Sequence, residues 1–453
     1  MNTKLRSSKL IIPLSGSICG VLVMTAFSPL ISTPRLYAGE ARARRADKDS
    51  SVPASVRASD APSPEDALGK GLDYLLSQQH PDGGWGQGGG WRQSANGNGS
   101  RVEGNVEDPS DLGNTCVSLV ALLRAGHSPS QGVHRDAAAK AFEFICRQVE
   151  QSDRDSLYVT SVRDTQLQVK IGVYVDTFLA GWALSELKGQ LASEVDEKRR
   201  IAALERVTGK IERNQRDDGS FAGNNGWAAV LSQGLCSKAL NMASRSGANV
   251  SKKALDKDQK QNTSGLDVAK GDFSAAPPTA EPSSAGVSLY REASKLEGLR
   301  ERAKSDAPRK KAAEQTLANA KAPAPAREAA RRELKEVADD EIAVKAANDA
   351  VSGKLHDSRY TAGFGNNGGE EFLSYLNVTE SIREKGGKDW ADWREKMWKT
   401  VCGAQNSDGS WAGQHCITGR TFCTATALMA LLSDHGAQNV GVNGAAPAAI
   451  VKE

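Results

Sequence analysis

The chain has 453 residues, of which 58 are Lys or Arg and 55 are Asp or Glu, so its formal net charge is only +3. So small an excess does not predict attraction to a polyanion such as nucleic acid. Glycine fills 44 positions, above its usual share of about 7%, while hydrophobic residues make up 39% and aromatic residues 5%. This composition excludes a multi-span membrane protein, a collagen and a wholly disordered chain, and the length allows one large or two ordinary domains.

Residues 1–38 have the layout of an export signal. Basic residues precede an apolar run from Leu10 to Ile31, and the small residues Ala38 and Gly39 follow it. Prolines and glycines inside the run disfavour a stable membrane anchor, which remains the alternative if the signal is not cleaved. Residues 39–64 contain no aromatic residue and predict a disordered linker. We expect an exported protein, periplasmic or extracellular, with no membrane span after the signal is removed.

A turn motif occurs three times, with Asp three residues, Gly four residues and an aromatic residue six residues after a Gln. The copies are Gln79, Asp82, Gly83 and Trp85; Gln215, Asp218, Gly219 and Phe221; and Gln405, Asp408, Gly409 and Trp411. An Asp-Gly pair ends a helix with a residue that accepts a positive φ. We expect the aromatic ring to fold back beside the Gln amide, which can cap free backbone groups at the helix end.

An amphipathic helix is predicted before each turn, and a helix that is apolar on nearly every face or rich in Ala is predicted after it. The predicted outer helices cover 67–79, 201–215 and 390–405, and the inner helices cover 115–123, 227–243 and 422–432. A degenerate copy between the first two turns has an outer helix near 140–148 and an inner helix from residue 176 to residue 184. The repeating unit is therefore a hairpin of one outer and one inner helix.

The spacing between the second and third turns leaves room for a further hairpin and a surplus. We assign its outer helix to 326–351, inside the intervening segment, and its inner helix to 370–383, which gives five hairpins. The toroid is otherwise expected over 65–246 and 353–436. Residues 247–352 are expected to be an insertion, with a low-complexity loop followed by a charged helical projection. From residue 290 to residue 350 the insertion has 14 basic and 12 acidic residues, a mixture that favours a solvated projection over nucleic-acid contact. Residues 290–322 could supply a sixth hairpin, and 437–453 read as a disordered tail.

The first turn and its helix match the Gln-Trp repeat of squalene-hopene and oxidosqualene cyclases through Lys70, Gly71, Tyr74, Leu75, Gln79, Gly83 and Trp85. Over 65–247 and 353–436 the chain resembles the superfamily of squalene cyclases and protein prenyltransferase β-subunits. The resemblance implies an α/α toroid, in which inner helices surround a central cavity and outer helices form a sleeve. The alternation of helix character predicts the same all-α architecture.

The catalytic motifs of that superfamily are absent. There is no Asp-x-Asp-Asp, the motif with which its cyclases protonate an alkene, and no prenyltransferase zinc triad of Asp, Cys and His. His415, Cys416 and Cys423 are the nearest set of metal ligands, but a Cys402–Cys416 disulfide with a buried Cys423 is the favoured interpretation in an exported chain. We therefore expect neither a metal nor a cofactor.

Candidate catalytic residues remain at the ends of the inner helices. Asp111 and Asp176 stand where two inner helices begin and could act as acid and base, although a carboxylate there more often caps its helix. Glu380 could point inward from the fourth inner helix, or it could have a surface or structural placement. Phe178, Trp182 and Trp227 could line an apolar pocket or belong to the repeat core.

Three functions follow as hypotheses. The favoured one is an exported binding or scaffold module that contacts a protein partner through the helical insertion. The second is an enzyme or carrier that acts on an isoprenoid or another apolar lipid in the cavity. The third is an enzyme of polysaccharide or peptide chemistry that uses the carboxylates at the rim.

Overall fold

The computed structural model describes residues 62–93, 99–102, 108–226, 228–274, 288–357, 360, 369–413 and 419–433. Within these residues thirteen helices account for nearly all regular structure, which confirms the all-α prediction. The predicted export signal, nearly all of the linker and the tail lie outside the described residues. Among the described helices, none has the length and apolar character needed to cross a membrane.

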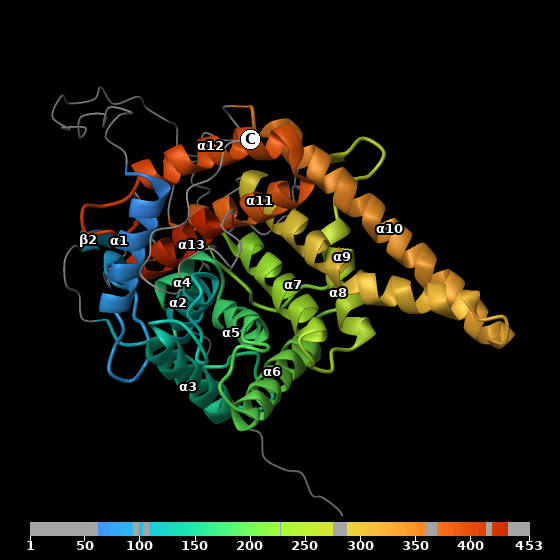
Figure 1. Cartoon of the computed structure of the whole chain (residues 1–453), viewed down its shortest axis with the longest axis horizontal. Coiled ribbons are helices and arrows are strands. Elements are labelled where there is room, and N and C mark those ends of the chain that lie inside the picture. The colour runs from blue at the N-terminus through green and yellow to red at the C-terminus, as the bar shows by residue number, and fades with distance from the viewer. Residues whose placement is uncertain are drawn as a thin grey trace, which may run out of the picture. The chain divides into compact units, whose positions relative to one another are not determined.

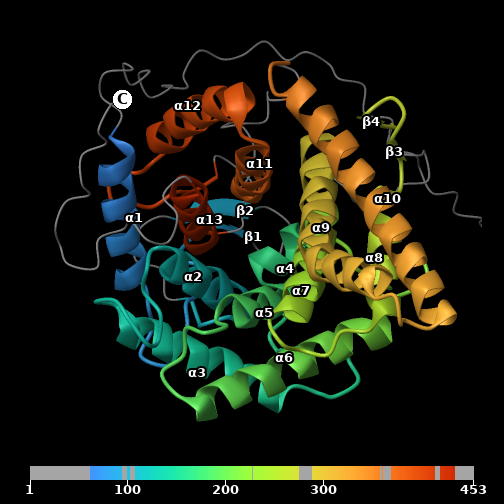
Figure 2. The same ribbon diagram turned by 45° about the vertical axis from the view of Figure 1, so that its right-hand side comes forward.

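Of the helices in the described residues, six form an inner layer and six form an outer layer, an arrangement that can be followed in Figures 1 and 2. The inner helices are α2 (Leu112–Arg124), α5 (Val175–Glu186), α7 (Ala229–Arg245), α9 (Ser288–Ala318), α11 (Glu371–Lys385) and α13 (Arg420–Leu432). The outer helices are α1 (Pro64–Ser77), α3 (Arg135–Gln151), α6 (Glu194–Asn214), α8 (Lys252–Thr263), α10 (Ala324–Lys354) and α12 (Gly387–Gly403). Each inner helix contacts the next, and α13 contacts α2, so the inner helices form a closed cycle.

Each later outer helix packs against the inner helix that precedes it in the chain, and α1 packs against α13. This pattern follows from helix character, because α5 is buried on every face from Val175 to Ser185 whereas α6 buries only one stripe. Small residues let the inner helices approach closely. A β-carbon added at Gly181 of α5 would lie 2.8 Å from the β-carbon of Ala239 on α7.

The segment predicted as an insertion instead supplies part of both layers. Helix α8 and the first half of α9 form a hairpin of the cycle, and Leu289, Ala293, Leu296 and Leu299 are fully or almost fully buried. The interpretation of 247–352 as an insertion is therefore wrong for this part. The apolar stripe was hidden by Glu and Arg residues between its members, and those charges are themselves paired inside the fold.

The second half of α9 and the first half of α10 pack together and extend beyond the two layers (Figures 1 and 2). We call residues 309–340 the arm. Pairs across the arm hold its base together, since Arg309 binds Glu333 and Glu336 and Lys310 binds Glu341. The helical projection expected from the sequence is thus limited to the arm.

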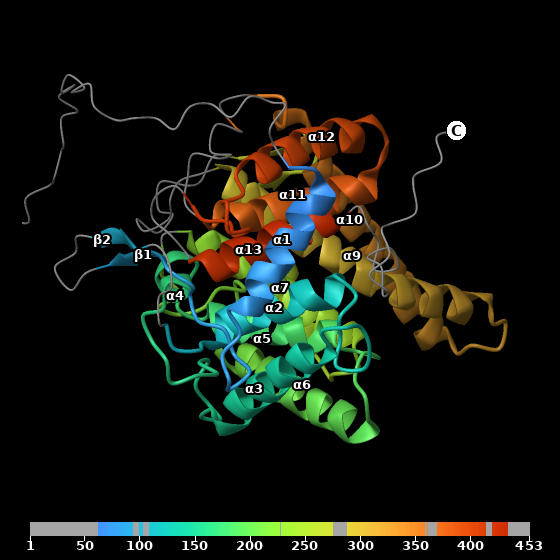
Figure 3. The same cartoon turned by 60° about the vertical axis from the view of Figure 1, so that its left-hand side comes forward.

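The remaining elements lie in the connections that lead from outer to inner helices. They are α4 (Gln166–Lys170) and two antiparallel strand pairs, β1 (Gly90–Gln93) with β2 (Gly99–Val102) and β3 (Leu266–Asp267) with β4 (Asp272–Phe273). Figure 3 shows β1, β2 and α4 at one end of the inner helices, with the arm extending on the opposite side.

In the first and last copies of the turn motif, the Gln amide joins neighbouring hairpins. Gln79 Nε2 donates to the carbonyl oxygen of Gly83 in its own turn and to that of Ala137 on α3, both at 2.9 Å. Gln405 Nε2 donates in the same way to Gly409, at 2.9 Å, and to Ala67 on α1, at 2.8 Å. The last copy therefore attaches the final hairpin to the first outer helix.

The Gly and the aromatic residue of the motif have separate tasks. Gly409 has φ +88°, and a β-carbon there would overlap the carbonyl oxygen of Lys70 on α1. Trp411 Nε1 donates to the carbonyl oxygen of Val401 at 2.7 Å, as Trp85 Nε1 does to that of Leu75. The indole, rather than the Gln amide, therefore caps the end of the outer helix.

Replacing Gln405 by alanine should lower the unfolding free energy by about 2 kcal/mol, because two hydrogen bonds are lost and two buried carbonyls lose a donor. Gln215 provides the matched control, since within the described residues its buried amide makes no hydrogen bond. Urea denaturation should therefore show a clearly smaller loss for Gln215→Ala. Equal losses in the two variants would contradict the bridging role of the Gln405 amide.

Candidate functional site

The two ends of the inner helices are built differently. Connections that lead into inner helices are long, such as 78–111 and 152–174, whereas those that lead out are short, such as 187–193 and the single residue Gly386. Binding and catalytic residues concentrate on long loops held by a rigid scaffold. The end at which the inner helices begin is therefore one candidate site, and it holds two of the predicted residues.

Asp111 and Asp176 lie together although 65 positions separate them in the sequence. Asp111 caps α2, with Oδ1 accepting from the backbone N–H of Asn114 and Oδ2 from its side-chain amide, both at 2.8 Å. Asp176 lies in the first turn of α5, where Oδ2 accepts from Gln168 Nε2. A β-carbon added at Gly113 would lie 2.6 Å from Asp176 Oδ1 and 3.6 Å from Asp111 Oδ1, so the two carboxylates share one small space.

Both carboxylates are buried, and burial is the main reason why their pKa values are raised. Burial and the neighbouring charge of Asp176 raise the pKa of Asp111 to about 7, against the hydrogen bonds from Asn114. Burial raises the pKa of Asp176 to about 6, although the Gln168 amide acts in the opposite direction. Two groups coupled in this way titrate as a pair, which holds about one proton near neutral pH.

Stability should therefore fall as the pH rises from 5 to 8. The folded-state pKa of Asp111 lies above its ordinary value of 3.8, so its contribution is complete below that value and is lost as the pH passes about 7. Asp111→Asn keeps a side chain that can cap the helix. In this variant the fall in unfolding free energy between pH 5 and pH 8, measured by urea titration at each pH, should be smaller by about 2 kcal/mol. The exposed Asp155 offers a control, and a profile as steep in Asp111→Asn as in the wild type would contradict this assignment.

The third predicted acid, Glu380, lies near the opposite end of the inner helices and binds three cations. Lys238 Nζ and Arg300 Nη2 lie 2.9 Å and 2.7 Å from its Oε2, and Arg124 binds its Oε1. Burial alone would raise the pKa of Glu380, but the charges of Arg124, Lys238 and Arg300 outweigh it and hold the pKa well below the usual value. A carboxylate that is held ionised is poorly suited to act as a general acid, and a catalytic role for Glu380 stays a prediction.

Around Glu380 the charges form a network that the sequence analysis missed. Glu297 lies 2.7 Å from Lys238 Nζ and 2.6 Å from Arg300 Nη2, and its side chain is almost fully buried. Two features of the sequence could have indicated this network. One is Lys238, which lies in a predicted inner helix, and the other is the opposite charge of Glu297 and Arg300, which are three residues apart. Their meeting with Glu380 depends on three helices that are distant in the sequence.

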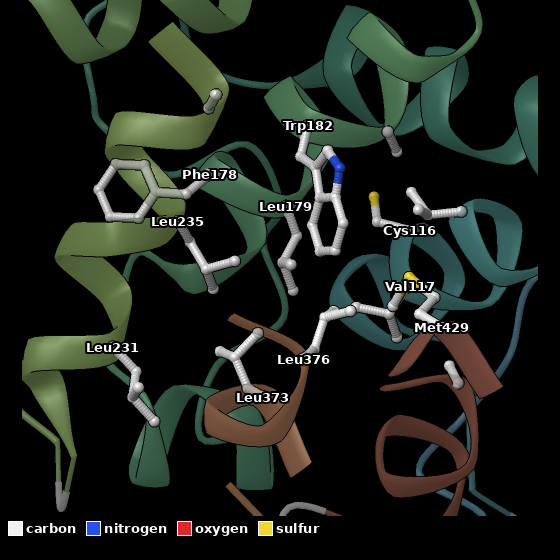
Figure 4. Close-up of a cluster of buried hydrophobic side chains, with 14 of the residues drawn as sticks. Cys116, Val117, Phe178, Leu179, Trp182, Leu231, Leu235, Leu373, Leu376 and Met429 are labelled. Carbon is white, nitrogen blue, oxygen red and sulfur yellow. The ribbon is translucent and has the colours of Figure 1, made fainter. Parts of the chain in front are cut away.

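The residues predicted to line a cavity belong to the hydrophobic core. Phe178 and Trp182 are fully buried, and Figure 4 shows them with side chains from α2, α7, α11 and α13 that point toward one another between the inner helices. Trp182 also borders the charged network, because Lys238 Nζ lies 4.3 Å from its ring centroid and its Nε1 donates to Glu186 Oε1 at 3.0 Å. Trp227 lies outside the described residues.

The predicted cysteine and metal chemistry stays untested. Cys402 and Cys423 are buried, but His415 and Cys416 lie outside the described residues, so the Cys402–Cys416 disulfide remains a prediction. Among the residues that the structure describes, no three or more His, Cys, Asp or Glu side chains are placed to hold a metal ion.

A pocket of about 340 Å³ opens at the end where the inner helices finish. Its lining comes from all six inner helices and consists of Arg124, Glu186, Lys238, Met242, Arg245, Arg300, Glu301, Lys304, Glu380, Arg383, Glu384, Leu432 and Ser433. The network around Glu380 forms part of its wall. This pocket, which we call the charged pocket, is the second candidate site.

Comparison with known proteins adds no functional information. No family model matches the chain, and no curated protein matches it. A solved structure of a protein from Actinoplanes is similar, with 14% sequence identity and a TM-score of 0.40, over 82% of this chain and 99% of that one. A likeness of this size carries no argument about fold or function.

Proposed function

We propose that the protein is an exported, non-catalytic binding or scaffold module related to the squalene cyclase and prenyltransferase toroids. The observation that supports this most is the packed space between the inner helices, where Leu179, Trp182 and Leu376 belong to one buried hydrophobic cluster (Figure 4). A lipid cyclase needs an open apolar chamber and a strong acid. Here the space is occupied by side chains, and Glu380 is neutralised by cations.

The arm is the element that we propose contacts a protein partner. It extends beyond the two layers, so a partner could bind it without disturbing the helices that hold the fold together (Figure 2). Its outer part carries cations that form no ion pair within the described residues, namely Lys311, Lys321, Arg327, Arg331 and Lys335. Such a surface suits a partner with an acidic face.

An arm truncation tests this function. Residues 311–332 would be replaced by a short Gly-Ser link, which preserves α8 and the buried half of α9. A larger deletion, of 247–354, would remove a whole hairpin. Proteins cross-linked to the full chain in its native host should be absent from the truncated variant, while the melting temperature changes little. Retention of every cross-linked protein would exclude the arm as the contact element.

An enzyme of polysaccharide or peptide chemistry is the second candidate, favoured by the Asp111–Asp176 pair. Two neighbouring carboxyl groups with pKa values of about 7 and about 6 could supply an acid and a base near neutral pH. Hydrolysis of a polysaccharide or peptide panel should then be lost in Asp176→Asn and Asp111→Asn and kept in Asp155→Asn. Activity that survives in both pair variants would exclude the pair from catalysis.

An enzyme or carrier for isoprenoids or other apolar lipids has less support, since the hydrophobic cluster occupies the space that such a ligand would need. Incubation with squalene followed by solvent extraction should yield neither bound lipid nor product. Recovery of either would restore this alternative and contradict the packed interior as the basis of the proposal.

A further inference from the structure

We propose that the charged pocket binds the anionic group, carboxylate or phosphate, of a small ligand. This inference rests on the proposed binding function and adds the chemical class of a ligand and its site. The pocket of about 340 Å³ is large enough for a small organic anion and is lined by side chains of all six inner helices.

The lining has an excess of positive charge. Six cationic side chains face four carboxylates across the pocket, and the buried Glu297 behind them reduces the excess of two charges to one. The carboxyl-terminal ends of helices are partly negative, which accounts for cations at this position but opposes the acids. An anion with a single charge would balance the remaining positive charge.

The floor and the rim of the pocket differ in composition. The side chains of Glu301 and Glu380 are only 3% and 11% exposed and are held by buried cations, so they form the floor. Lys304 is 39% exposed, and Arg383 is exposed and forms no ion pair within the described residues. Glu384 is the accessible acid of the rim, and it is already bound to Arg300 and Lys304. At the rim an entering anion therefore meets Lys304 and Arg383 beside one acid, Glu384, that is already paired.

The donors are fixed in place by the network. Arg245 is anchored by Glu301 and by Ser305 Oγ at 2.8 Å, and Lys304 is held between Glu301 and Glu384. Groups that are already ordered lose little entropy when a ligand binds. Met242 and Leu432 add an apolar wall that suits the body of an organic acid.

Stability alone gives a weak reason for such a network. Removing buried ions from water costs several kcal/mol each, and replacing buried ion pairs by apolar side chains is often neutral or stabilising. The other part of the inner layer is filled with apolar side chains, as in Figure 4. Ligand binding would explain why the charged residues Lys238, Arg300 and Glu297 lie between the inner helices at the end that forms the charged pocket.

Titration calorimetry of the full chain at matched ionic strength tests the proposal, with inorganic phosphate and benzoate as separate probes. At least one probe should bind saturably, and the double variant Arg383→Gln/Lys304→Gln should weaken binding at least tenfold. The control Lys311→Gln/Arg331→Gln removes the same charge from the arm and should bind as the wild type does. If the double variant fails to fold, Arg383→Gln alone should still weaken binding severalfold.

Two results would overturn the inference: no saturable binding of either probe to the wild type at millimolar concentration, or equal weakening in the pocket and arm variants. Phosphate binding without benzoate binding would assign a phosphate ligand, and the reverse would assign a carboxylate. Failure of the arm truncation would leave this result unaffected, so the inference and the proposed partner contact can fail separately.

Discussion

Replacing Gly409 by alanine is expected to lower the unfolding free energy by about 3 kcal/mol and to loosen the last hairpin from the first. The residue has φ +88°, which costs a side chain about 1–2 kcal/mol, and the added methyl group would overlap the carbonyl oxygen of Lys70. The motif can relieve this overlap only by separating its turn from α1, which would weaken the hydrogen bond from Gln405 to Ala67. Urea denaturation followed by circular dichroism measures the loss.

Gly403→Ala is the matched control for this substitution. Gly403 is the last residue of α12, and a β-carbon added there would meet no atom within 4 Å. An alanine at such a position should be neutral or slightly stabilising, because it restricts the unfolded chain. If both variants lose the same stability, the contact between the turn and α1 is not what Gly409 provides.

Glu380→Gln is the second substitution with a large expected effect, a loss of about 3–5 kcal/mol of unfolding free energy. Removing one member of a buried charge network leaves the others uncompensated, and here Lys238, Arg300 and Arg124 would face a neutral amide. Chemical denaturation at pH 7 measures the effect. Glu384→Gln changes an acid of the same pocket that is 45% exposed and should cost at most about 1 kcal/mol.

The pH dependence gives this prediction an independent check. The pKa of Glu380 lies well below its ordinary value of 4.5, so the stability it provides is present above that value and is lost as the pH falls through the folded-state pKa. The difference between the wild type and Glu380→Gln should therefore shrink in acid, below about pH 4. A constant difference down to pH 2 would show that the variant acts through packing alone.

The hairpin repeat could be predicted from the sequence because its signals are local. Gln, Asp-Gly and an aromatic residue at fixed offsets mark the ends of α1, α6 and α12, and helix character separates the outer helices from the inner ones. The second partners of the Gln79 and Gln405 amides could not be predicted in this way. Ala67 and Gln405 lie at opposite ends of the chain, and only the order of the helices in space brings them together.

The hairpin of α8 and α9 shows where composition misleads. Glu297, Arg300 and Glu301 made the segment resemble a solvated projection, yet Leu296 and Leu299 between them are buried. Charged residues indicate exposure only when water is their partner. In α9 their partners are Lys238, Glu380 and Arg245, which belong to other helices.

The same distinction between local signals and long-range contacts applies to the candidate sites. Asp111 and Asp176 were identified one at a time as residues that begin inner helices, and that position is visible in the local sequence. Their closeness was not, because it depends on the packing of α2 against α5 at Gly113. Glu380 was selected correctly as a residue of an inner helix, but its role depends on cations that the sequence places far away.

The bond from the last turn to the first outer helix also bears on how the molecule comes apart. An open array of repeats can fray from either terminus, and its stability is approximately a sum over neighbouring units. When the first and last hairpins contact each other, neither is a terminal repeat with an unpaired face from which unfolding can start. The described helices should therefore unfold cooperatively. By the same reasoning, a circularly permuted version that is newly cut at Gly386 and joined between residues 433 and 64 should keep its helices.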